Sequence, residues 1–165
     1  MKKLVSTILA LSCISTLCLT AGSVKVGKPV PSLQSLLPEA KLPATRGKVV
    51  LVDFWASWCA PCRVAFPCLS KLQDTYRSRG LVVVGISVDE KVADYQSFVS
   101  KMRPSFSLAH DASHRAASTF GPSTMPSSYL IDRRGVVRHI HSGFRGAKTE
   151  AEYIAEIEAL LAEKN

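Results

Sequence analysis

Residues 52–62 read VDFWASWCAPC, and this stretch decides the fold. Its first half is an apolar run broken only by Asp53, which is typical of a strand buried on both faces. Its second half carries the pair Cys59 and Cys62, with Pro61 just before the second cysteine. Proline suits the first turn of a helix, where its missing N–H costs little. The stretch therefore predicts a buried strand that leads into a helix carrying two thiols.

A cysteine pair at this position has the chemistry of a disulfide exchanger. Such a protein needs one thiolate that attacks and a second thiol that resolves the mixed disulfide. Free backbone N–H groups at a helix N-terminus favour an anion, so the pKa of a thiol falls there. We therefore expect Cys59 to be the exposed nucleophile and Cys62 to be the buried resolving thiol.

The rest of the chain alternates between strand and helix patterns. The predicted helices cover residues 61–79, 92–102, 113–120 and 148–164, and the predicted strands cover 49–54, 81–88, 106–108, 128–132 and 136–142. Residues 24–47 are rich in proline and predict an irregular lead-in or a short edge hairpin. Strands that alternate with helices and end in a hairpin and a helix predict one α/β domain with a mixed central sheet.

The N-terminus is typical of an export signal. Two lysines precede an uncharged, mostly apolar run over residues 4–19, and small residues follow it. We expect residues 1–23 to be a signal peptide and 24–165 to be the domain, although an uncleaved anchor fits the same pattern. Export makes nucleic acid an unexpected partner. The 19 basic and 13 acidic residues that remain suit a solvated surface, an acidic partner or an anionic membrane surface.

Removing the signal leaves three cysteines, which is a poor number for a disulfide framework. It fits one functional pair and one spare thiol, Cys68. In a helix, Cys68 lies about 9 Å along the axis from Cys62, which is too far for a bond without unwinding. We expect Cys68 to be a half-buried apolar residue, and Trp55 and Trp58 to pack around the site. His110 and His114 lie outside every motif and are expected at the surface or in loops.

With these motifs the chain resembles the thioredoxin-like proteins of the TlpA/ResA branch. Residues 52–62 look like the active-site segment of thioredoxins, and residues 126–132, PSSYLID, are similar to the late proline motif of that branch. The resemblance covers nearly all of residues 24–165. It implies a thioredoxin fold in which residues 90–120 are an inserted helical segment between the second core strand and Pro126.

The resemblance also assigns roles to single residues. It implies a cis peptide bond between Met125 and Pro126, which leaves the Met125 backbone free to pair with an extended substrate. Trp58, Ala60 and Pro61 would complete the substrate-binding surface. Asp53 matches the buried acid of thioredoxins and would take the Cys62 proton through water.

A hydrogen-bonded acid of purely structural importance is the alternative for Asp53. One position departs from the family pattern, since members that act in cytochrome maturation usually carry Glu where this chain has Ala65. The acid–base group is therefore expected at the thioredoxin-like position, Asp53.

The function predicted from these residues is a reductase of disulfides in exported proteins, with a membrane thiol reductase as electron donor and no cofactor beyond the dithiol. The segment between the cysteines, Ala60-Pro61, is closer to the Gly-Pro of reducing thioredoxins than to the Pro-His of strong oxidants. An oxidase or isomerase on the same fold stays open.

Other classes use cysteines in other patterns. A copper-binding chaperone would pair the thiols with a histidine, but usually spaces its cysteines one residue wider. Peroxiredoxins carry a proline–threonine–cysteine signature that is missing here. Cys59 and Cys62 could also be two of the four ligands of a zinc site, which would need two more ligands. The candidates are His139 and His141, which alternate on one predicted strand and would complete such a site only by accident of the fold.

Overall fold

Strand β1, Val49–Trp55, is the central strand of a five-stranded sheet in the computed structural model, which describes residues 23–164. The order is β3-β2-β1-β4-β5, and the other strands are β2 (Leu81–Ser87), β3 (Ser107–His110), β4 (Ser127–Ile131) and β5 (Val137–Ser142). The β1, β2 and β3 strands are parallel, whereas β4 and β5 are each antiparallel to the neighbour before them in the sheet. The predicted mixed α/β sheet is confirmed.

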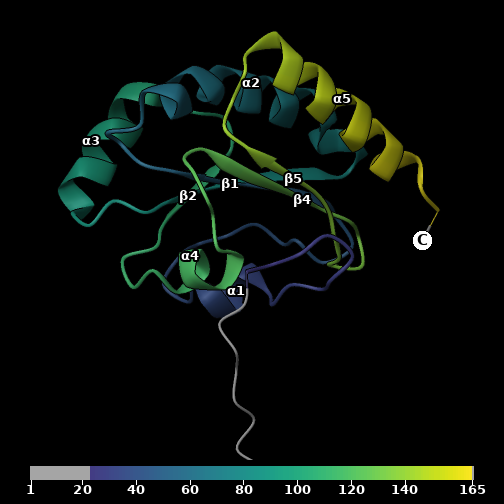
Figure 1. The fold of residues 1–165 in the computed structure, drawn as a ribbon, viewed down its shortest axis with the longest axis horizontal. Helices are drawn as coiled ribbons and strands as arrows, with labels where there is room; N and C mark the ends of the chain where they lie inside the picture. The colour runs from purple at the N-terminus through teal and green to yellow at the C-terminus, as the bar shows by residue number, and fades with distance from the viewer. Residues whose placement is uncertain (1–22, 165) are drawn as a thin grey trace, which may run out of the picture.

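Helices cover both faces of this sheet (Figure 1). One face carries α2 (Ala60–Tyr76), α3 (Val92–Met102) and α5 (Ala147–Ala162), and the other carries α1 (Leu33–Leu36) and α4 (Arg115–Phe120). Each face has its own apolar core. Because side chains alternate along a strand, Leu51 and Trp55 of β1 join the core under α2, while Val52 and Phe54 join the other. Asp53 therefore lies on the α2 side.

The element boundaries differ from the sequence expectation in a few places. The lead-in contains the short helix α1, which was not predicted, and it pairs with the start of β5 through an isolated bridge between Pro29 and Val136 and backbone hydrogen bonds to Val137. The α2 helix ends at Tyr76, and a 3-10 turn continues to Gly80, whose φ of 105° suits only glycine well. The inserted segment is not purely helical, because β3 forms the edge of the sheet next to β2.

Trp55 fixes the end of β1 just before the cysteine loop. Its ring is fully buried, and its centroid lies 4.6 Å from that of Phe98 and 5.1 Å from that of Phe66. Gly85 on β2 makes room for the ring. A Cβ atom there would come within 3.1 Å of the indole Nε1 and 2.7 Å of the Leu108 side chain. A glycine in the interior of this strand is therefore explained by packing.

The predicted signal or anchor, residues 1–23, lies outside the described residues except for Ser23. Among residues 23–164, no helix has the length and apolar character needed to cross a membrane.

Candidate active site

Cys59 and Cys62 form a disulfide at the start of α2. Their Cα atoms are 5.3 Å apart. Cys59 is the N-cap residue of the helix, and its Sγ accepts a hydrogen bond of 3.2 Å from the backbone N–H of Cys62. A donor that points at the Cys59 sulfur stabilises negative charge on it once the disulfide is reduced. This geometry would favour a thiolate at Cys59 over one at Cys62.

The sequence prediction that Cys59 is exposed is wrong for this disulfide form. Only 3% of Cys59 is accessible, and Cys62 is fully buried, because both side chains turn into the apolar core under the first turn of α2. The residues around them are open instead: Ala60 and Pro61 are exposed, and Trp58 is 71% exposed. Packing was predicted for both tryptophans, which is correct for Trp55 and wrong for Trp58.

The Met125–Pro126 peptide bond is cis, as the resemblance implied. Its place follows from the sheet: β4 runs antiparallel to β1, and Ser127 at its start pairs with Phe54 near the end of β1. The loop before Pro126 and the loop that carries Cys59 therefore meet at one end of the sheet, where β1 ends and β4 begins. Pro126 is buried, and Met125 is half-buried and packs against both cores.

Asp53 is a fully buried carboxyl group on the face of β1 that α2 and α5 cover. Its Oδ1 accepts a hydrogen bond of 2.7 Å from Ser128 Oγ, which lies 2.6 Å from the hydroxyl of Tyr153. Its Oδ2 has no hydrogen-bond partner among the described residues. Burial raises the pKa of Asp53 to about 7, and the Ser128 hydrogen bond offsets part of that rise. The carboxyl can therefore exchange a proton near neutral pH.

Asp89 holds the loop before the cysteines, and sequence reasoning missed it. This buried carboxylate accepts hydrogen bonds from the Ser57 backbone N–H at 3.0 Å, from the Ser57 hydroxyl at 2.8 Å and from the Ser87 hydroxyl at 2.7 Å. It thereby ties the end of β2 to the residue before Trp58. A Ser-x-Asp pattern that begins on the last residue of a buried strand was the available signal, because buried polar groups need partners.

Comparison with known proteins identifies the family of this chain and its relatives. Residues 26–140 match the model of the AhpC/TSA family. The chain belongs to the AhpC/TSA family. It is 30% identical over 117 residues to the thiol-disulfide oxidoreductase ResA of Bacillus thuringiensis (strain Al Hakam), which covers 69% of this chain and 68% of ResA. It is 31% identical over 143 residues to the thiol:disulfide interchange protein DsbE of Pseudomonas aeruginosa, covering 82% of this chain and 76% of DsbE.

Solved structures of the same kind share the fold of this AhpC/TSA family member. A Chlorobium tepidum protein described as a thiol:disulfide interchange protein DsbE superposes with a TM-score of 0.75 at 34% identity, covering 85% of this chain and all of that one. A secreted disulfide oxidoreductase of Mycobacterium tuberculosis gives a TM-score of 0.59 at 26% identity over 70% of this chain and 84% of its own. Together with the Cys59–Cys62 disulfide, the ResA and DsbE relatives show that this protein is a thiol–disulfide oxidoreductase of the ResA and DsbE type.

The remaining cysteine among residues 23–164 of this AhpC/TSA family member, Cys68, lies further along α2 and packs in the same core as Cys62. Burial, followed by the charge of Glu150, raises the pKa of Cys68 to about 11, and the charge of Asp53 adds to the rise. A thiol with this pKa is a poor nucleophile near neutral pH. Cys68 is more deeply buried than the half-buried residue expected from the sequence.

The histidines take no part in a metal site within residues 23–164, where no group of three or more His, Cys, Asp or Glu side chains is arranged to hold an ion. His141 contacts Glu156 at 2.7 Å, and His139 contacts the same carboxylate at 3.3 Å. His114 is exposed, as expected. His110 is not a free surface residue, since it stacks on Tyr95 at 5.2 Å between ring centroids.

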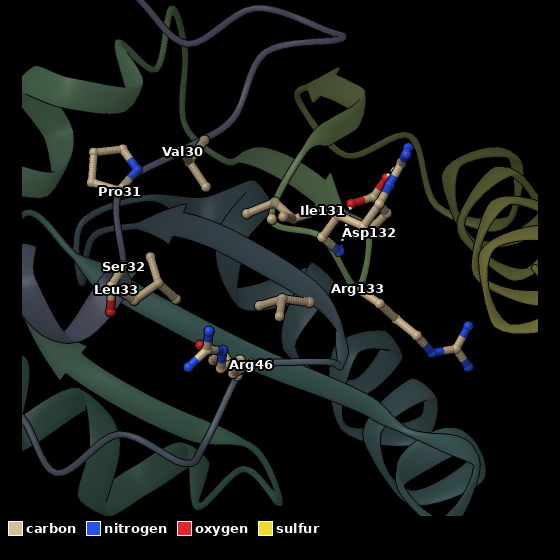
Figure 2. A pocket seen from close by; sticks show the side chains of 12 residues that line it. Val30, Pro31, Ser32, Leu33, Arg46, Ile131, Asp132 and Arg133 are labelled. Carbon is tan, nitrogen blue, oxygen red and sulfur yellow. Dashed lines mark hydrogen bonds and ion pairs between the residues drawn. The ribbon is translucent and has the colours of Figure 1, made fainter. Parts of the chain in front are cut away.

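A surface cavity of about 630 Å³ lies at the opposite end of the sheet from the cysteines. Figure 2 shows it between the lead-in around Ser32 and Leu33 and the end of β4 at Ile131. Arg133 extends away from it to donate to carbonyl groups at the end of α5, and Asp132 and Arg134, which both line the cavity, pair with each other. The cavity is separate from the redox site.

Proposed function

We propose that this enzyme reduces disulfides in exported proteins. The observation that carries the proposal is the Cys62 N–H directed at the Cys59 sulfur. Asp53, a buried acid with a pKa near neutrality, lies on the same side of the sheet. The first feature prepares a nucleophile, and the second offers a proton acceptor for the resolving thiol.

The reaction runs in two exchanges. The Cys59 thiolate attacks one sulfur of a substrate disulfide and forms a mixed disulfide, while the other substrate sulfur leaves and takes up a proton. Cys62 then passes its proton toward Asp53 and attacks the Cys59 sulfur. This step forms the Cys59–Cys62 disulfide and releases the second substrate thiol. The substrate gains two electrons, and a membrane thiol reductase would return two electrons to the enzyme.

The substrate would bind at the end of the sheet where the cysteine loop and the loop before Pro126 meet. Trp58, Ala60 and Pro61 form the exposed rim beside the disulfide, and the Met125 backbone lies across from them next to Pro126. An extended peptide bound there would pair with the Met125 backbone and place its disulfide over Cys59. A flat, mostly backbone-directed site suits protein substrates of varied sequence.

Two sequence features and one relative support the reducing direction and the compartment. Ala60-Pro61 resembles the Gly-Pro of reducing thioredoxins, and the N-terminus has the pattern of a signal peptide or of an uncleaved anchor. One relative of known structure is described as secreted. We therefore place the enzyme outside the cytoplasm, with no role for nucleic acid.

The redox potential of the purified dithiol tests the direction. We expect a value below about −220 mV in a glutathione or dithiothreitol titration, near that of thioredoxin. A value of about −120 mV would identify an oxidase instead.

Trapping tests the roles of the two cysteines. Cys62→Ser should accumulate mixed disulfides with exported proteins, because attack still occurs and resolution does not. Cys59→Ser is the matched control and should accumulate none. If Cys59→Ser traps substrates and Cys62→Ser does not, the roles are reversed.

A further inference from the structure

Three buried groups from three different elements form a hydrogen-bonded row under the cysteine helix. They are the Asp53 carboxyl on β1, the Ser128 hydroxyl on β4 and the Tyr153 hydroxyl on α5, joined at 2.7 Å and 2.6 Å. All three side chains are essentially inaccessible to solvent. We propose that Ser128 and Tyr153 are positioning residues that leave Oδ2 of Asp53 as the proton-accepting oxygen and set the pH at which it accepts. This inference rests on the proposed role of Asp53 in resolution.

The direction of the hydrogen bonds follows from counting hydrogens. A serine hydroxyl has a single hydrogen. When Asp53 is ionised, it can only accept, so the Ser128 hydrogen must point at Oδ1. Ser128 then has lone pairs alone for Tyr153, and the tyrosine must donate. Both hydroxyl dipoles therefore point toward the carboxylate and favour its ionised form.

The same arrangement distinguishes the two carboxylate oxygens. Oδ1 is held by Ser128, whereas Oδ2 is buried and has no partner within residues 23–164. Protonating Oδ2 leaves the hydroxyl row intact. Protonating Oδ1 would force Ser128 and Tyr153 to reverse. Oδ2 is thus the oxygen on which a proton from Cys62 costs least.

Few other titratable groups from the described part of the chain, residues 23–164, face this carboxyl. From α2 come Cys62 and Cys68, and the charge of Asp53 raises the pKa of Cys68. From α5 comes Tyr153, whose pKa is raised by its burial and then by the charge of Asp53. Behind Tyr153 lie His141, with ring centroids 4.9 Å apart, and Glu156. Cys68 and Tyr153, whose pKa values are raised, are neutral near pH 7, so neither of them supplies a positive charge, and the hydroxyl row supports the charge of Asp53.

Carboxyl titration by carbon NMR in the reduced full-length protein tests the inference directly. Ser128→Ala should move the Asp53 midpoint upward by about one to two pH units, because a hydrogen bond to a charged group is lost. Tyr153→Phe should move it in the same direction by less than about one unit, since it weakens the remaining bond. The double variant should match Ser128→Ala, because Tyr153 reaches the carboxyl through Ser128.

Tyr129→Phe is the matched control. Its hydroxyl is also buried and donates to the Phe120 carbonyl at 3.1 Å, but it lies in the core on the other face of the sheet. It should leave the Asp53 midpoint unchanged. An unchanged midpoint in Ser128→Ala or in Tyr153→Phe would overturn the inference, as would an equal shift in Tyr129→Phe.

The pH profile of mixed-disulfide resolution gives a second readout, and its midpoint should move upward with that of Asp53. A purely structural role of Ser128 would lower stability and leave this midpoint in place. If the wild-type enzyme resolved no mixed disulfide at any pH, the proposed function would fail, whereas the carboxyl titration would still decide the inference.

Discussion

Asp53 and Asp132 are both buried carboxyl groups, 0% and 4% exposed, but their partners differ. Asp132 accepts hydrogen bonds from the backbone N–H groups of Arg134 and Val136 and contacts the guanidinium groups of Arg134 and Arg138. Burial acts to raise its pKa, but these donors outweigh burial and hold the pKa below its usual value. Asp53 has one serine hydroxyl, and its pKa rises to about 7.

The difference shows that burial alone does not fix the charge of a carboxyl group. Asp132 closes the β4–β5 turn at the far end of the sheet, where a permanent negative charge organises four donors. Asp53 lies on the face of the sheet under α2, and it has too few hydrogen-bond donors to offset the free-energy cost of burying a negative charge. A group in that condition changes its protonation near the pH at which thiols exchange, which suits a proton acceptor.

The pH dependence of stability should separate the two most strongly. The folded-state pKa of Asp53 is raised, so its contribution is fully present below the unfolded value near 4 and is lost as the pH rises to about 7. Wild type should therefore lose on the order of 4 kcal/mol relative to Asp53→Asn between about pH 4 and pH 7. Urea midpoints of both proteins across this range measure the difference.

Asp132 should show the opposite sign. Its folded-state pKa is lowered, so its contribution is present above the unfolded value and is lost as the pH falls through the folded one. Asp132→Asn should therefore leave the slope between about pH 4 and pH 7 unchanged. If the free energies of unfolding of wild type and Asp53→Asn change in parallel over that range, the proposed difference between the two acids is wrong, because Asp53 would then be ionised like Asp132.

Removing Asp132 should cost stability and leave chemistry alone. Asp132→Ala leaves the partly buried N–H groups of Arg134 and Val136 without their acceptor, which should lower the free energy of unfolding by about 2 kcal/mol. The redox potential and the rate of disulfide exchange should stay at wild-type values. Chemical denaturation and insulin reduction on the same preparation check both statements. A change in exchange rate without a change in stability would reverse the roles of the two acids.

Removing the charge of Asp53 should do the converse. Asp53→Asn should slow the resolution step about a hundredfold, since a buried thiol ionises poorly without a base. Stability above about pH 7 should rise or stay level, because a buried charge is gone. Stopped-flow decay of a mixed disulfide measures the step. A purely structural Asp53 predicts lower stability with unchanged resolution.

The backbone around the site followed from local sequence. An apolar run broken by Asp53, and a proline between two cysteines, give β1 and α2 from neighbouring residues alone. The cis bond before Pro126 came from the family motif. The four-residue helix α1 was missed because so short a segment carries no periodic pattern.

The environment of Asp53 could not be predicted, because it depends on residues far apart in sequence. Ser128 is 75 positions from Asp53, and Tyr153 a further 25. Only the antiparallel register of β1 and β4 brings Ser128 opposite Asp53. The burial of Cys59 and the exposure of Trp58 have the same origin. They depend on how the loop turns at the end of β1, which Asp89 controls from the loop that follows β2.

The smallest effect should appear at Cys68, which reports the charge of Asp53 from the same core. With the active-site pair kept as a disulfide, the pKa of about 11 leaves about one Cys68 in a thousand ionised near pH 8. The charge of Asp53 contributes to that pKa, so Asp53→Asn should lower it by less than about one unit.

Alkylation of Cys68 should then be up to several-fold faster in Asp53→Asn above about pH 7, where wild-type Asp53 is ionised. Below about pH 6 the two rates should converge, because Asp53 is neutral in both proteins. Peptide mapping separates Cys68 from the cysteines near the N-terminus. Asp132→Asn, at the other end of the sheet, should leave the rate unchanged. If the ratio of the Cys68 alkylation rates in Asp53→Asn and wild type does not depend on pH, the substitution acts on Cys68 through packing. The charge of Asp53 would then have no effect on the pKa of Cys68.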